Sequence, residues 1–259
     1  MRKGLLGSIV VVVAVLVLSV TGAQTSPQSG TAAAPSHDLS GVWLIKQTYQ
    51  DAAHLGVYGT PMRGVPPMTA WAKEKYAVAH PGGVVGTGDE DNDPALHCDP
   101  TGMPRIMGEG PFEFIQIPGR ILVLIEDAYA RRTIWMDGRA LPKDPDPTWY
   151  GYSVGRWEGD TLVVDTVGLD ERSWLNGAGY PHSDQAHIVE RIHRKDHDNL
   201  EVATTITDPK AYTQPWVNPP RVYLLKPKYE MQEALCVPED EQSFLKSVRE
   251  PADPNAHKR

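Results

Sequence analysis

The sequence predicts a mainly β protein, an antiparallel up-and-down barrel or strongly curved sheet of lipocalin-like shape, with an insertion of loops and a short helix. Three observations favour this fold. Apolar and β-branched runs recur at intervals of roughly 8–12 residues, separated by turn residues. No long helical pattern alternates with these runs, which argues against a parallel sheet. Gly and Pro each occur 23 times in the 259 residues, which indicates many turns.

The chain begins with the pattern of a secretory signal peptide over residues 1–23. Arg2 and Lys3 supply positive charge, residues 5–20 are almost entirely apolar, and Ala23 provides a small residue at the cleavage position. The apolar run is shorter than the roughly 20 residues of a membrane-spanning helix. We therefore expect cleavage, export to the periplasm or the extracellular space, and no membrane span afterwards. An uncleaved anchor is the alternative.

The rest of the chain is expected to form one domain with a tail on each side. Residues 24–37 are small and polar and predict a disordered lead-in. Residues 38–238 predict the barrel domain, which includes a lid insertion at about residues 50–110. Residues 239–259 are charged and interrupted by proline, and they predict a flexible C-terminal tail.

The expected strands follow from apolar runs bounded by turn residues. These runs cover residues 42–49, 112–117, 121–127, 131–136, 152–157, 161–167, 187–194, 200–207, 222–225 and 229–236. Glu158-Gly159-Asp160 and residues 195–199 are hairpin signals between neighbouring runs. The insertion predicts one helix at residues 69–79, where Thr69 can cap the first turn, and the tail predicts a short helix at residues 242–248.

Charge and cysteine content narrow the function classes. The formal net charge is −8 and the pI is about 5.6, and no cluster of Lys and Arg forms a basic face, so we expect no nucleic-acid partner. Cys98 and Cys236 are the two cysteines of the chain. Because exported proteins usually pair their cysteines, we expect a disulfide between them, with two free thiols as the alternative.

Three carboxylates interrupt the apolar faces of expected strands, namely Glu190, Asp165 and Glu233. A buried carboxylate is costly unless it is paired, protonated or solvated by a cavity. Arg131 and Arg132 are adjacent on one strand, so one of them must point inward as a counter-ion. These residues predict a polar barrel interior that orients a ligand or moves a proton. A purely structural network of ion pairs, or the opposite choice of face, is the alternative.

Two loops ahead of expected strands are rich in aromatic residues and histidine. Trp149 and Tyr150 precede one strand, whereas Trp174 and His182 precede another strand that begins with His187. Aromatic side chains at the rim of a barrel can line a pocket, and histidine can shuttle a proton near neutral pH. The alternatives are aromatic packing at the rim and a histidine in a surface loop.

The sequence predicts neither a bound metal nor a cofactor. His182, His187 and Glu190 have the spacing H-x4-H-x2-E, which matches no established zinc motif, and the last two face opposite sides of a strand. The acidic run at residues 89–93 lacks the turn glycine and closing glutamate of a calcium loop. A phosphate-binding loop, a dinucleotide fingerprint and the Gly-x-Ser-x-Gly elbow are all missing from the sequence.

Four segments resemble a family of exported, uncharacterised proteins of soil bacteria. They are RRTIWMDGR at 131–139, DPTWYGYSVGRWEGDTLVVDT at 146–166, PHS at 181–183 and TITDPKAY at 205–212. The resemblance covers Cys98 to Cys236 and implies export and a single domain, but it implies no reaction and assigns no catalytic role. Cys236 is followed by Val-Pro-Glu-Asp where the family has Glu-Asn, so a different C-terminal cap is expected. Gly41-Val42-Trp43 is similar to the Gly-x-Trp opening of lipocalins.

The favoured function is the binding of a small, partly apolar or aromatic molecule inside an exported barrel. The aromatic rings would stack on the ligand, and charged side chains would pair with its polar groups. The residues expected to contact the ligand are Trp149, Tyr150, Trp174, Glu233 and Arg131.

Two other functions stay open. A cofactor-independent lyase, isomerase or hydrolase could occupy the same cavity, with a carboxylate as base, a histidine as acid or proton shuttle, and an arginine stabilising an oxyanion. Its catalytic residues would be Glu190, Asp165, His182, His187 and Arg132. The third hypothesis is a structural or interaction protein with a filled barrel.

Overall fold

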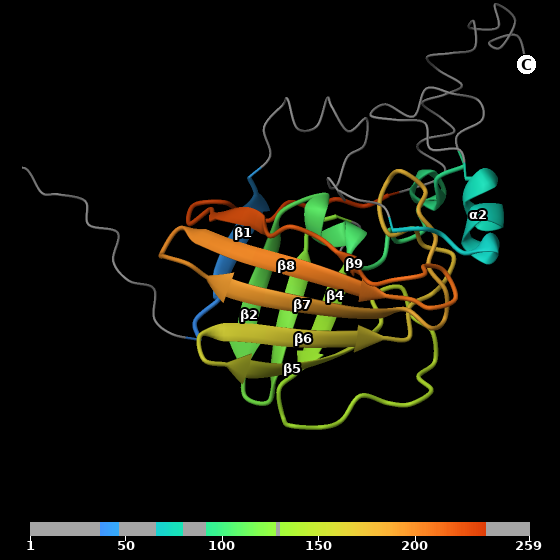
Figure 1. Cartoon of the computed structure of the whole chain (residues 1–259). Helices are drawn as coiled ribbons and strands as arrows, with labels where there is room; N and C mark the ends of the chain where they lie inside the picture. Colours follow the sequence, from blue (N-terminus) through green and yellow to red (C-terminus); the bar gives the residue numbers. More distant parts are fainter. Residues whose placement is uncertain (1–36, 47–65, 80–91, 128–129, 237–259) are drawn as a thin grey trace, which may run out of the picture. The chain divides into compact units, whose positions relative to one another are not determined.

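The structure is a computed structural model that describes residues 37–46, 66–79, 92–127 and 130–236 (Figure 1). The expected signal peptide, most of the lead-in, the helix at 242–248 and the C-terminal tail lie outside the described residues.

The described strands close into a nine-stranded barrel with one extra strand, which confirms the prediction of a mainly β barrel. The order around the ring is β10-β1-β2-β3-β4-β5-β6-β7-β8, and pairing of β10 with β8 closes it. The barrel strands are β1 (Gly41–Ile45), β2 (Phe112–Ile117), β3 (Arg120–Ile125), β4 (Arg131–Trp135), β5 (Tyr152–Glu158), β6 (Thr161–Val167), β7 (His187–Arg194), β8 (Asn199–Thr207) and β10 (Arg221–Leu225). The extra strand, β9 (Trp216–Val217), pairs with β8.

The expected strand at 229–236 is wrong. This segment contains only one isolated bridge, between Ala234 and Asp127, and is otherwise irregular. The carboxylate of Glu126 replaces a strand ladder as its anchor. It accepts hydrogen bonds from the hydroxyl of Tyr229 at 2.9 Å and from the backbone N–H of Gln232 at 2.6 Å. A side-chain anchor of this kind leaves no alternating pattern that a sequence could reveal.

The barrel consists of two antiparallel sheets joined at two seams. β4 and β5 run parallel and pair through only two residue pairs, Ile134 with Ser153 and Trp135 with Val154. β8 and β10 form the other seam through four pairs. Parallel neighbours need a long crossover, and residues 136–151 supply it, which explains why the ring is mixed rather than purely antiparallel.

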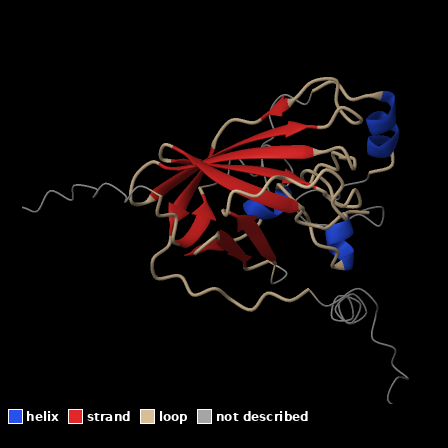
Figure 2. Cartoon of the chain, turned by 90° about the horizontal axis from the view of Figure 1, so that it is seen from below, coloured by secondary structure: helices blue, strands red, loops and turns tan. Residues whose placement is uncertain are grey.

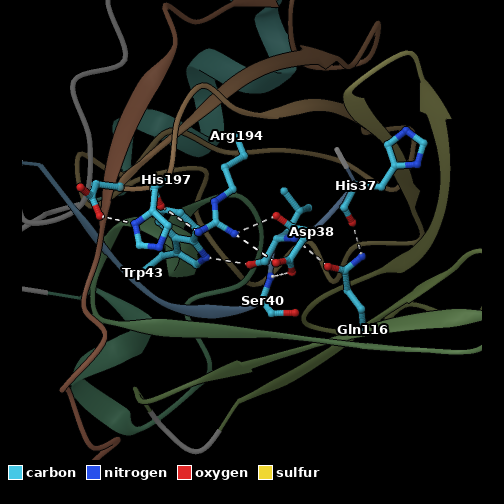
Figure 3. Close-up of polar contacts among 9 residues, drawn as sticks. His37, Asp38, Ser40, Trp43, Gln116, Arg194 and His197 are labelled. Atoms are coloured by element: carbon cyan, nitrogen blue, oxygen red, sulfur yellow. Dashed lines mark hydrogen bonds and ion pairs between the residues drawn. The ribbon is translucent and has the colours of Figure 1, made fainter. Parts of the chain in front are cut away.

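Residues 37–40, which we name the N-terminal strap, close one end of the barrel (Figure 3). The backbone carbonyl of His37 and the N–H of Leu39 both bond to the side-chain amide of Gln116 near the end of β2, each at 2.7 Å. The ring of His37 stacks on Trp157, with the ring centroids 4.2 Å apart. Leu39 is 1% exposed, so the strap fills this end with an apolar side chain.

Arg194 and Trp43 hold the N-terminal strap against the barrel (Figure 3). The guanidinium of Arg194 donates to the backbone carbonyls of Asp38, at 2.9 Å, and His197, at 2.8 Å. It also lies over the Trp43 ring, 5.1 Å from its centroid, while the indole N–H of Trp43 donates to the carbonyl of Leu39 at 2.9 Å. The strap therefore contacts β1, β2 and the β7–β8 turn at one end of the barrel.

The long loops gather at the opposite end, which we name the loop end (Figure 1). It contains helix α2 (Ala70–Ala77) and the short helical turns η1 (Pro94–His97) and η2 (Arg105–Gly108). The expected helix at 69–79 is confirmed with its cap, because the Thr69 hydroxyl accepts from the N–H of Ala72 at 3.3 Å. Tyr76 of α2 stacks on Tyr180, with the ring centroids 4.9 Å apart. Figure 2 shows how small the helical content is beside the strands.

The expected disulfide between Cys98 and Cys236 is present, with the two Cα atoms 5.4 Å apart. It links the turn after η1 to the end of the described chain, across a sequence separation of 138 residues. The barrel interior itself is packed with large buried side chains. Phe112 makes edge-to-face contacts with Phe114 and Tyr223, with ring centroids 5.4 and 5.1 Å apart.

Candidate functional site

Two of the expected catalytic residues, Arg132 and Glu190, form an ion pair inside the barrel. Both side chains are 1% exposed. Arg132 also donates to the hydroxyls of Ser153, at 3.1 Å, and Thr166, at 2.9 Å, and these two hydroxyls bond to each other at 2.9 Å. The sequence prediction that one of the paired arginines turns inward is correct for Arg132. Arg131 lies exposed on the outer face, so its assignment to a binding cavity in the barrel is wrong.

This buried pair bridges the narrow seam between β4 and β5. Arg132 lies on β4, and its three partners lie on β5, β6 and β7. The side chain therefore joins the two sheets where the backbone ladder has only two residue pairs. Tyr223 completes the polar interior, and burial is the main cause that raises the pKa of its hydroxyl. The arrangement agrees with the structural alternative, a network of buried ion pairs.

Asp165 and His187 lie on the outer face of the barrel, which corrects the expectation that Asp165 points inward. The Oδ1 atom of Asp165 is 2.9 Å from Nε2 of His187, and Oδ2 accepts from Arg156 at 2.5 Å. The His187 side chain is 38% exposed. Residues on neighbouring strands continue this cross-strand charge ladder, because Glu158 bonds to Arg191 at 2.8 Å. Alternation along β6 explains the error, since Leu162, Val164 and Thr166 take the inner face.

Glu233 is exposed on the irregular segment that replaces the expected last strand. Its assignment as a ligand contact inside the barrel is therefore wrong. The expectation relied on alternation along a strand that does not form.

His182 lies buried in the loop end rather than in a surface loop. Its Nε2 atom is 2.9 Å from the hydroxyl of Ser173, and its Nδ1 atom is 3.3 Å from the carbonyl of Ser183. Burial lowers the pKa of His182, so the ring is neutral at neutral pH. The carboxylate of Asp208 fixes the same loop by accepting from the N–H and the hydroxyl of Ser183 at 2.6 and 2.7 Å. His182 thus holds loops together and does not face solvent as a proton shuttle would.

The expected aromatic residues do lie at the loop end. The Trp149 ring contacts the guanidinium of Arg172, 4.4 Å from the ring centroid, and Arg172 bonds to Asp170 at 2.6 Å. Trp174 is half-buried. Tyr150 is half-buried as well, and burial, together with the nearby negative charges of Asp127 and Glu109, raises its pKa to about 12.

A cavity of about 280 Å³ opens at the loop end, and we name it the loop-end pocket. Its polar lining comes from Asp99, Thr101, Arg105, Glu109 and Asp127, and the Cys98–Cys236 disulfide forms part of its wall. A second cavity of about 370 Å³ lies outside the barrel, between the 138–141 segment and β5, and reaches Arg156 and Asp165. Neither of these two cavities reaches the Arg132–Glu190 pair.

Arg105 is the centre of the polar side of the loop-end pocket. Its guanidinium forms a two-pronged contact with Asp93, with both N–O distances 2.8 Å, and its Nε donates to Oε1 of Glu109 at 2.5 Å. The three side chains are only 7%, 12% and 11% exposed. Local structure sets this geometry, because Asp93 caps η1 and Arg105 begins η2, four residues before Glu109.

Glu109 and Thr101 carry hydrogen-bonding atoms that form no hydrogen bond of normal geometry with the described residues, although the Thr101 hydroxyl lies close enough to the Glu109 carboxyl to lower its pKa. Among the described residues, neither Oε2 of Glu109 nor the hydroxyl of Thr101 has a hydrogen-bond partner of normal geometry. Burial raises the pKa of Glu109, Asp127 raises it further, and the nearby Arg105 and Thr101 oppose the rise. A pocket wall with unused polar atoms can bind a polar group of a ligand.

Sequence reasoning missed Asp93, Thr101, Arg105 and Glu109 as site residues. The Arg105–Glu109 pair has the i,i+4 spacing of a helical ion pair. That spacing was the one local signal, and it indicates a structural contact rather than a pocket.

The part of the chain that the structure describes contains no group of three or more His, Cys, Asp or Glu side chains arranged to hold a metal ion. It also contains no helix with the length and apolar character to cross a bilayer. Comparison of the chain with protein-family models, with curated proteins and with solved structures gave no match.

Proposed function

We propose that this protein binds a small, partly apolar molecule in the loop-end pocket. The observation that carries the proposal is the polar wall of that pocket, where Oε2 of Glu109 and the neighbouring hydroxyl of Thr101 lack a hydrogen bond of normal geometry among the described residues. Natural proteins leave few buried polar atoms unpaired, so such atoms in the wall of a cavity indicate a place for a polar group of a ligand. Ala95, Pro100 and the disulfide provide apolar wall beside them, which suits a ligand of mixed character.

The proposal places the binding site at the loop end, whereas the sequence predicted it in the barrel interior. In the interior, Glu190 and Arg132 pair with each other and connect the two sheets, and large aromatic side chains pack around Phe112. Nη1 of Arg132 has no hydrogen-bond partner among the described residues, but neither of the two cavities reaches it. At the loop end, the polar atoms of Thr101 and Glu109 that form no hydrogen bond of normal geometry with the described residues line a cavity. Tyr150, one of the aromatic residues expected to contact the ligand, also lies at the loop end. The negative charges of Glu109 and Asp127 are close enough to raise its pKa.

We further propose that the protein acts outside the cytosol, in the periplasm or extracellular space. The Cys98–Cys236 disulfide supports this location, because disulfides persist mainly in oxidising compartments. The apolar run at residues 5–20 supports the same location.

The proposal is tested by screening a library of small organic fragments against the ¹⁵N-labelled protein by NMR. We expect fragments whose chemical-shift changes concentrate on Thr101, Glu109 and Tyr150. Glu109→Gln should weaken such fragments, while Glu158→Gln on the outer face should leave them unchanged. The absence of any fragment that maps to this pocket, in a protein that is folded by its NMR spectrum, would overturn the proposal.

A second candidate function is acid–base catalysis in the same pocket, favoured by the raised pKa of the buried Glu109 carboxyl. Recovery of the natural ligand after incubation separates the two functions. A binding protein returns the compound unchanged. An enzyme converts it, and Glu109→Gln should then abolish turnover, with Glu158→Gln as the control.

A further inference from the structure

We propose that the ligand of the loop-end pocket is a small organic cation, an amine, amidine or guanidine attached to a compact apolar or aromatic body. The inference rests on the proposed function, because it names the chemical class of the ligand bound at that site.

The charge of the pocket carries the inference. Among the described residues, the charged side chains of its lining are Asp99, Glu109, Asp127 and Arg105, three carboxylates and one guanidinium, which give a formal charge of −2. The charge of Arg105 is already engaged by Glu109 and, outside the lining, by Asp93. A cation therefore enters a field of excess negative charge, whereas a carboxylate or phosphate would be repelled.

Burial strengthens this preference. Glu109 is 11% exposed and Thr101 is 7% exposed, so charges in this wall interact more strongly than they would in water. Oε2 of Glu109 and the neighbouring hydroxyl of Thr101, which lack a hydrogen bond of normal geometry within the described part of the chain, can both serve as acceptors, because a carboxylate oxygen can only accept and a hydroxyl can do so. Ammonium and amidinium groups offer only N–H donors, and these donors match both positions.

The geometry also favours an organic cation over a metal ion. The guanidinium of Arg105 sits between Asp93 and Glu109 and bonds to both, so these two carboxylates do not converge on a common point. The cavity of about 280 Å³ is at the small end of ligand pockets. Ala95, Pro100 and the disulfide form the apolar wall that a compact hydrocarbon body needs.

Three probes of nearly the same shape test the inference, namely benzamidine, neutral benzamide and anionic benzoate. Binding to the full chain is measured by calorimetry and located by NMR. We expect benzamidine to bind at least tenfold more tightly than benzamide, and benzoate not to bind. Glu109→Gln should reduce benzamidine affinity at least tenfold, and Thr101→Val should reduce it less. Glu158→Gln, which removes an exposed carboxylate on the outer face, is the matched control for charge.

The pH dependence provides a second readout. Protonation of Glu109 removes a negative charge from the pocket, so benzamidine affinity should fall as the pH is lowered through the raised pKa of this carboxyl. In Glu109→Gln this part of the dependence should disappear. The charged and titratable groups that surround Glu109 and are present in both proteins are Arg105, Asp93, Asp99, Asp127 and Tyr150.

Several outcomes would overturn the inference of a cationic ligand but would leave the proposed binding function standing. Benzamide or benzoate binding in the pocket as tightly as benzamidine would show that charge does not select the ligand. Tighter binding of calcium than of benzamidine, with shifts at Glu109, would identify a metal site instead. Binding of other fragments in the pocket without binding of benzamidine would also overturn the inference. Only the absence of all fragments from the pocket would overturn the proposed function itself.

Discussion

At the scale of single residues, Arg132 and Glu190 show how a buried ion pair can serve the fold. Periodicity along the strand correctly placed Glu190 inside, and the adjacent arginines correctly required one inward counter-ion. The sequence could not show that Ser153 and Thr166 would complete the network. The long crossover after β4 separates it in sequence from β5 and β6, the strands that carry these two residues, so no local pattern indicates that β4 and β5 become neighbours. The same reasoning failed for Asp165, since a strand with apolar residues on both faces leaves its orientation open.

We expect Glu190→Gln to destabilise the protein by about 3–5 kcal/mol, because it leaves the Arg132 charge buried without a counter-ion. Urea unfolding measures this change. The double variant Arg132→Met/Glu190→Leu should lose less than the single variant, since it removes both charges. Hydrogen exchange should rise at the β4–β5 seam in the single variant. A Glu190→Gln protein as stable as the exposed control Glu158→Gln would contradict the assigned role.

At the scale of elements, the strands and the capped helix were predictable because their signals are local. Alternation identified the strands of the ring, and Thr69 identified the start of α2. The extra strand β9 escaped prediction because two residues, Trp216 and Val217, are too short to show a period. The N-terminal strap escaped as well, since its contacts join residues far apart in the sequence, such as Leu39 and Gln116.

The strap prediction concerns Leu39, which closes one end of the barrel. Leu39→Ala should destabilise the protein by about 2–5 kcal/mol, because it removes a buried apolar side chain and leaves a cavity. Ser40→Ala, at the exposed neighbour, is the control and should change stability little. Urea unfolding measures both. If the two variants are equally stable, Leu39 does not plug the barrel.

At the scale of the whole molecule, the closed barrel could be predicted but the loop-end pocket could not. Regular strand spacing predicts a ring. The pocket forms where the segments holding Cys98, Glu109, Asp127 and Cys236 meet, and that meeting depends on the order of strands around the ring. The cysteine content alone predicted the Cys98–Cys236 disulfide, which forms part of the pocket wall.

Loss of the disulfide should affect the whole molecule and the pocket together. Replacing Cys98 and Cys236 by serine removes a link over 138 residues, for which the chain-entropy model gives about 5 kcal/mol as an upper estimate. We expect a lower Tm and weaker benzamidine binding, because the disulfide is part of the pocket wall. Calorimetry on oxidised, reduced and serine-substituted protein measures both effects. Unchanged Tm and binding after complete reduction would contradict this expectation.

The strap and the pocket occupy opposite ends of the barrel, and this separation decides how the molecule can be attached to a support. His37 leaves the barrel beside Gly159 at the closed end, with its Nε2 atom 2.6 Å from that carbonyl. A tether or fused label joined at His37 therefore begins at the end of the barrel opposite the pocket. One joined directly after Cys236 begins at the wall of the pocket mouth. Surface immobilisation through the amino-terminal side keeps the site open to solution.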